Sequence, residues 1–228
     1  MNPMLANIVF EFFSKGGPVM WPILASSLVA VAVVGERTFW WLRESHKRDP
    51  QKLEQLFAAL ENGDVAAAQN ISKGSDDPVI RVIRHGLGHV GHKHSSLLGA
   101  LQLAAGIELK RAGRFLTVMD TLVTLAPLLG LLGTVTGLMR AFLNIGSAEL
   151  SVTAVTGGIG EALIATACGL GIAIFALVPF NYFSARVTQL QFDLETAATN
   201  VEVMVGGGNA GDTVHLHKPA SPSHATSH

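Results

Sequence analysis

Charged side chains are scarce in this sequence. Asp, Glu, Lys and Arg make up 14% of its 228 residues, against about 25% in soluble domains. Hydrophobic residues make up 49%, and the mean hydropathy is +0.39. The formal net charge is −1, which argues against a nucleic-acid-binding surface. The composition therefore favours a protein embedded in a lipid bilayer, with no nucleic-acid partner.

Groups that carry chemistry are scarce as well. The one cysteine, Cys168, cannot form a disulfide within the chain, and among Ala and Gly it is interpreted as a small packing residue. The glycine-rich residues 157–160 lack the following Lys-Ser/Thr of a phosphate-binding loop. No nucleophile–base pair is recognisable. The sequence therefore predicts a protein that is not an enzyme and has no cofactor.

Histidines are the one group whose spacing suggests a metal site. His85, His89 and His92 share a helical face at positions i, i+4 and i+7. Glycines interrupt this segment, however, and no carboxylate stands nearby to orient the rings. We interpret these histidines as solvated and predict no metal, with a metal site as the alternative.

Three long apolar runs dominate what the sequence does contain. They are Pro18–Gly35, Thr121–Met139 and Ala162–Ala185, each long enough to cross a bilayer as a helix. Trp21 lies near the start of the first run, as expected for a residue of the membrane interface. The pair Glu36-Arg37 follows that run and is interpreted as a stop signal. The predicted fold is an all-α integral membrane protein with three transmembrane helices.

The distribution of positive charge predicts the orientation of these helices. Residues 37–114 contain 12 of the 16 Lys and Arg residues. Because positive loops stay on the cytoplasmic side, this segment is predicted to be cytoplasmic. The N-terminus and the loop Asn144–Gly157 are then periplasmic, and the C-terminus is cytoplasmic.

Helical patterns continue outside the apolar runs. Lys52–Leu60 and Val65–Ile71 indicate a short helical pair, and Asp77-Pro78 has the form of a helix start. Ser95–Phe115 keeps a helical period into the second span, and Thr188–Val205 keeps one beyond the third. The second and third transmembrane helices are therefore predicted to be long and to extend into the cytoplasm, with a cytoplasmic helical loop before them.

These patterns divide the chain into eight segments. Met1–Ser14 is either an amphipathic segment lying on the membrane or an extension of the first span. The predicted segments are an N-terminal periplasmic or interfacial segment (1–17), the first transmembrane helix (18–42), a cytoplasmic helical loop (43–114), the second transmembrane helix (115–143), a periplasmic loop (144–157), the third transmembrane helix (158–185), a cytoplasmic helix (186–205) and a disordered tail (206–228).

The second and third spans each carry a stripe of small residues. Such stripes let membrane helices approach closely through their backbones. The predicted helix-packing residues are Ala126, Gly130, Gly133 and Gly137 in the second span and Ala162, Ala165, Gly169 and Ala173 in the third.

Three polar residues border these stripes. Glu161 is the strongest functional candidate, because a carboxylate at membrane depth costs about 2.5–3.5 kcal/mol and such groups usually face a bundle interior or a water-filled path. Its alternative is an interfacial acid near a helix N-terminus. Thr134 and Thr166 are either polar groups of that path or ordinary threonines bonded to their own helix.

The hairpin of the second and third spans resembles a known family. APLLGLLGTVTGL followed by GGIGEALIATACGLGIAIFALVPFNYF is similar to the ExbB/TolQ/MotA proton-channel family, specifically its three-span ExbB/TolQ branch. The resemblance implies that Thr134, Glu161 and Thr166 belong to a proton pathway. It also implies a homo-pentamer, a single-span partner of the ExbD/TolR type and a periplasm-spanning TonB- or TolA-type protein.

The expected function is that of an ExbB-like subunit of an inner-membrane proton-driven motor. With its ExbD-type partner it would conduct protons and energise a TonB-type protein for outer-membrane import. Two alternatives remain open. One is a TolQ-like subunit of the Tol envelope-maintenance system, and the other is a membrane scaffold that conducts nothing.

Overall fold

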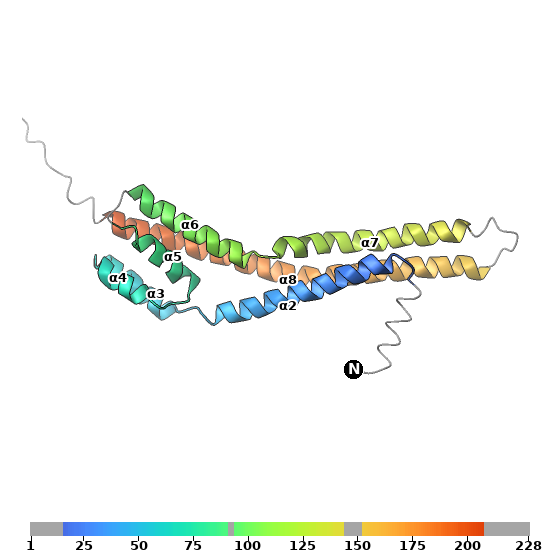
Figure 1. The fold of residues 1–228 in the computed structure, drawn as a ribbon, viewed down its shortest axis with the longest axis horizontal. Coiled ribbons are helices and arrows are strands. Elements are labelled where there is room, and N and C mark those ends of the chain that lie inside the picture. The colour runs from blue at the N-terminus through green and yellow to red at the C-terminus, as the bar shows by residue number, and fades with distance from the viewer. Residues whose placement is uncertain (1–15, 91–93, 144–151, 208–228) are drawn as a thin grey trace, which may run out of the picture. The chain divides into compact units, whose positions relative to one another are not determined.

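All regular secondary structure that the computed structural model describes, in residues 16–90, 94–143 and 152–207, is helical (Figure 1). This result confirms the predicted all-α class. The helices are α2 (Met20–Ser45), α3 (Pro50–Glu61), α4 (Val65–Ser72), α5 (Pro78–Leu87), α6 (His94–Ala112), α7 (Leu116–Leu143) and α8 (Val152–Gly207). The predictions for Met1–Ser14 and for the tail beyond Gly207 lie outside the described residues.

Three stretches are long and apolar enough to cross a membrane. They are Met20–Ser45, Ser96–Leu143 and Val155–Val205, in agreement with the three predicted spans. Many of their large apolar side chains, such as Leu128, Leu163 and Val178, are exposed on the isolated chain. A bilayer would cover such side chains, so the protein is membrane-embedded.

The chain divides into two compact units. The first contains α2, the last residues of α6, α7 and the first part of α8, and the second contains the rest of the helices and the last part of α8. In the first unit α2 packs against α7. The beginning of α2 also packs on α8, where Val19, Met20 and Ile23 enclose Ala165. Cys168 is partly buried against this cluster, which fits its interpretation as a packing residue.

Side-chain caps stabilise the first turns of three helices in the second unit. Asp49 accepts a hydrogen bond from the backbone of Lys52 at the start of α3, and Asp64 does the same for Ala67 at the start of α4. Asp77 accepts from Val79 N at the start of α5, which confirms the predicted Asp-Pro helix start. Each cap satisfies a backbone N–H that the first turn leaves unpaired. The predicted pair of short helices is present as α3 and α4.

One helix prediction is wrong. The pattern of Ser95–Phe115 predicts a helix that continues into the second span, but α6 ends at Ala112 and α7 begins at Leu116. Between them Phe115 has φ +63°, in the left-handed region that residues other than glycine rarely adopt. The helical period of the sequence continues through this point, so periodicity alone does not detect the break.

A buried arginine binds the backbone at this break. Arg37 of α2 is 1% exposed, and its Nη1 donates to the carbonyl oxygens of Arg111, Ala112 and Arg114 at 3.3, 2.9 and 2.8 Å. The last carbonyls of a helix have no partner within it, and positive charge is favourable at that end. Arg37 therefore stabilises the end of α6, a role that its interpretation as a stop signal does not include.

The start of α8 is also earlier than expected. The sequence predicts a loop over Asn144–Gly157, whereas the structure has residues 152–157 as the first turns of α8. At its other end α8 continues to Gly207, so the helix predicted over Thr188–Val205 is confirmed. The positions at which these helices enter and leave the membrane stay predictions.

Candidate functional site

Small residues form the contact between α7 and α8. All eight predicted packing residues are buried. A Cβ added to Gly169 would lie 2.5 Å from the carbonyl oxygen of Ala126, and one added to Gly137 would lie 2.8 Å from that of Gly158. In both cases the nearest atom belongs to the backbone. The two helices therefore approach so closely that these glycines leave no room for a side chain.

Thr166 adds a hydrogen bond to this contact. Its Oγ1 donates to the carbonyl oxygen of Gly130 on α7 at 3.0 Å. Thr134 lies one turn after Gly130, but its Oγ1 donates to Leu131 O of its own helix at 2.7 Å. Thr166 thus joins α7 and α8, while Thr134 is a half-buried threonine bonded within α7, as is common in membrane helices.

Glu161 lies on a different side of α8 from Thr166. It precedes Thr166 by five residues, which separates the two by about 140° around an α-helix. Its Oε1 accepts a hydrogen bond from Nη1 of Arg140 at 2.6 Å, with 17% of the glutamate side chain and 43% of the arginine side chain exposed. The carboxylate also contacts Gly17 in the turn before α2. Thr166 therefore contacts α7 at Gly130, one turn before Thr134, whereas Glu161 lies on a different side of α8 from Thr166.

Two arginines bind groups that the sequence did not predict as their partners. The partner of Glu161 is Arg140, and a signal for it was present: opposite charges flank the loop of an antiparallel hairpin, one at the end of α7 and one near the start of α8. Arg37 gave no comparable signal, because the carbonyl groups that it binds are more than 70 residues away in the sequence.

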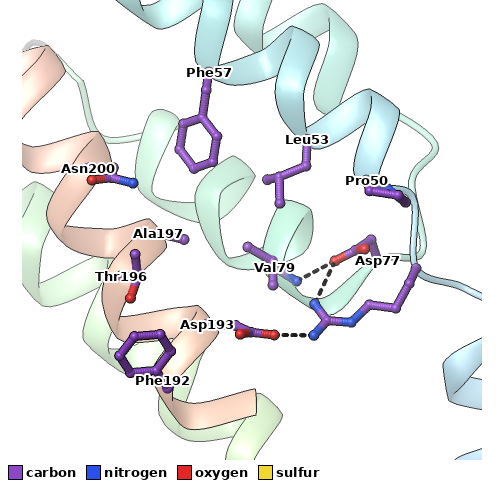
Figure 2. A pocket seen from close by; sticks show the side chains of 11 residues that line it. Pro50, Leu53, Phe57, Asp77, Val79, Phe192, Asp193, Thr196, Ala197 and Asn200 are labelled. Carbon is purple, nitrogen blue, oxygen red and sulfur yellow. Dashed lines mark hydrogen bonds and ion pairs between the residues drawn. The ribbon is translucent and has the colours of Figure 1, made fainter. Parts of the chain in front are cut away.

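The second unit contains a cavity of about 380 Å³. Figure 2 shows its apolar side chains, among them Leu53 and Phe57 of α3 and Phe192 of α8. Arg48 lies at one side, within 3.8 Å of Asp77 and paired with Asp193. The sequence gave no indication of this cavity, because its lining comes from three separate segments of the chain.

The histidines do not form a metal site within the part of the chain that is described. There the rings of His85 and His89 are nearly parallel with centroids 6.1 Å apart, and Nδ1 of His89 is 3.0 Å from the carbonyl oxygen of His85. In residues 16–90, 94–143 and 152–207, no three His, Cys, Asp or Glu side chains are grouped closely enough to hold a metal ion. His92, the third member of the predicted face, is outside the described residues.

Comparisons with known proteins agree on one family. The profile of the MotA/TolQ/ExbB proton channel family matches residues 74–196, which include α5, α6, α7 and most of α8. ExbB-like 1 of Synechocystis sp. is 38% identical over 188 residues, covering 79% of this chain and 72% of that protein. ExbB-like 3 of the same organism is 36% identical over 171 residues, covering 74% and 81%. The biopolymer transport protein ExbB of Neisseria gonorrhoeae is 42% identical over 89 residues, covering 39% and 40%.

Proposed function

This chain belongs to the MotA/TolQ/ExbB proton channel family, and we propose that it is an ExbB-like subunit of a proton-driven motor in the bacterial inner membrane. The N-terminus is then periplasmic and the C-terminus cytoplasmic. The main support is the similarity to ExbB-like proteins over about four fifths of the chain, together with three helices that can cross a membrane. The ExbB name of these relatives favours the ExbB-like function over the TolQ-like one.

The proposed complex is a homo-oligomer, with a pentamer expected for the family. α7 and α8 line its central path, and a single-span ExbD-type partner supplies an acidic residue in that path. This chain needs such a partner, because the described parts of its apolar runs contain no carboxylate midway across the membrane. Proton flow along the interface of the two subunits would energise a TonB-type protein for import through the outer membrane.

Thr134, Thr166 and Glu161 have different roles in this proposal. The two threonines hydrate or hydrogen-bond the path, and Glu161 provides a negative charge at one end of it. The contacts support this division, since Thr166 lies at the α7–α8 contact and Glu161 is held as one member of an ion pair.

The proposed function can be tested with the gene neighbourhood and one purification. We expect a neighbouring gene that encodes a short protein with one N-terminal span and an aspartate in that span. Co-expression should yield a complex whose subunits can be counted by native mass spectrometry. A stable complex that supports energised uptake in cells is the expected result. If the purified chain forms an oligomer that never retains the single-span protein, the result supports the alternative of a scaffold that conducts nothing.

The role of Glu161 is tested in the same complex. Glu161→Gln removes the charge and nearly preserves the shape of the side chain. We expect the complex to form in normal yield and proton-driven uptake to be lost. Uptake at the level of the unmodified protein would instead assign the proton path to the threonines and the partner alone.

A further inference from the structure

The carboxylate of Glu161 lies where three segments of the first unit meet. Arg140, near the end of α7, donates to its Oε1 at 2.6 Å. From the other side, the turn before α2 approaches so closely that a Cβ on Gly17 would stand 1.6 Å from the same Oε1 and 2.4 Å from Cδ. Gly17 has φ +69°. Only a glycine both adopts this backbone conformation without strain and leaves space for the carboxylate.

The Glu161 carboxylate has a charged partner and a helix N-terminus beside it. The side chain is 17% exposed, and a largely buried carboxylate requires a charged or hydrogen-bonding partner. Arg140 supplies a charge-assisted hydrogen bond. The N-terminus of helix α2 is a second favourable partner for the carboxylate. Its N-cap residue, Val19, makes no side-chain cap and lies two residues after Gly17. Negative charge is favourable beside such an uncapped helix N-terminus.

We propose that Arg140 is a positioning residue that holds the Glu161 carboxylate against Gly17. We call Gly17, Arg140 and Glu161 the carboxylate clamp. The clamp joins the beginning of α2, the end of α7 and the beginning of α8. It also holds Glu161 away from Thr166, so that Glu161 acts as a fixed charge and does not itself pass protons along the path. This last consequence rests on the proposed function, whereas the clamp itself does not.

Carbodiimide labelling measures the clamp directly. Dicyclohexylcarbodiimide converts a protonated carboxyl group to a stable N-acylurea, and a charged carboxylate held by an arginine is protected. The full chain would be labelled in lipid nanodiscs and analysed by peptide mass spectrometry. The unlabelled form of the same Glu161 peptide serves as the internal reference.

Loss of the Arg140 charge should expose Glu161 to the reagent. We expect Arg140→Gln to raise the labelled fraction of Glu161 about tenfold or more, because a charge-assisted hydrogen bond is lost. Arg140→Lys keeps the charge and should restore most of the protection. Equal labelling of Glu161 in the unmodified protein and in Arg140→Gln would overturn the proposal.

Gly17 provides a second, independent variant. Gly17→Ala places a methyl group where the carboxylate lies, so we expect Glu161 labelling to rise although Arg140 is intact. The matched control is Gly63→Ala. Gly63 has a similar φ of +74° but no atom within 4 Å of an added Cβ, so it carries the backbone strain without the contact. The same labelling of Glu161 in both alanine variants would contradict the clamp.

The charge swap Arg140→Glu/Glu161→Arg separates the clamp from a general loss of folding. We expect the swap to recover the thermal stability that either single change loses, but not proton-driven uptake, since the negative charge is then on α7. A double variant no more stable than the weaker single variant would overturn the proposal. A complex of the chain with its single-span partner that conducts no protons would refute the proposed function while leaving the labelling result unchanged.

Discussion

Thr166 of α8 donates a side-chain hydrogen bond to a backbone carbonyl of α7, at Gly130. Such interhelical bonds contribute about 0.6 kcal/mol on average in a membrane protein. We expect Thr166→Val to reduce the free energy of unfolding by about that amount and to reduce proton-driven uptake more strongly. The control is Thr136→Val, since the Thr136 hydroxyl bonds only to its own helix. Thermal unfolding and uptake in cells measure the two effects, and equal effects of the two variants would contradict a special role of Thr166.

Arg37 affects stability in a different way. Because it donates to three carbonyl groups at the break between α6 and α7, Arg37→Met leaves them without this donor. Each buried polar group left unpaired costs about 1–3 kcal/mol. We therefore expect a large fall in the unfolding temperature of the purified protein. The control is Arg43→Met in the last turn of the same helix, where the side chain is exposed and the change should be nearly neutral.

At the scale of the elements, the close approach of α7 and α8 gives a matched pair of glycine variants. A Cβ on Gly169 would meet backbone atoms of α7 at 2.5 and 3.1 Å, whereas a Cβ on Gly171, in the same helix, would meet nothing within 4 Å. We expect Gly169→Ala to separate the helices and lower stability by roughly 1–3 kcal/mol, as overpacking does. Gly171→Ala should be neutral or slightly stabilising. Thermal unfolding in nanodiscs would show no difference between them if the contact were absent.

Sequence alone predicted the helices better than their ends. The caps at Asp77 and the small residues of α7 and α8 are local signals, and the structure has them where the sequence placed them. The break at Phe115 was not predicted, and the bonds that Arg37 makes there come from a residue more than 70 positions away in the sequence. The pairing of Arg140 with Glu161 depends on the register of the hairpin, which residue spacing does not determine.

At the scale of the whole molecule, the orientation in the membrane can be measured by cysteine labelling. In a Cys168→Ala background, Asn62→Cys should react with a membrane-impermeant thiol reagent only from the cytoplasmic side, because the positive charge is concentrated in residues 37–114. Asn62 is exposed in the second unit, so the fold does not block the reagent. Ser147→Cys should react from the periplasmic side. Labelling from the opposite sides would invert the proposed orientation and the direction of proton flow.

Proton flux into liposomes tests the central claim most directly. The chain would be reconstituted with its single-span partner around a pH-sensitive dye, and a potassium diffusion potential would drive protons inward. The account predicts flux when both proteins are present. It predicts none with either protein alone, and a strong reduction with Glu161→Gln or with the partner aspartate changed to asparagine. A stable complex that carries no protons, or one whose flux is unchanged by both substitutions, would contradict the account.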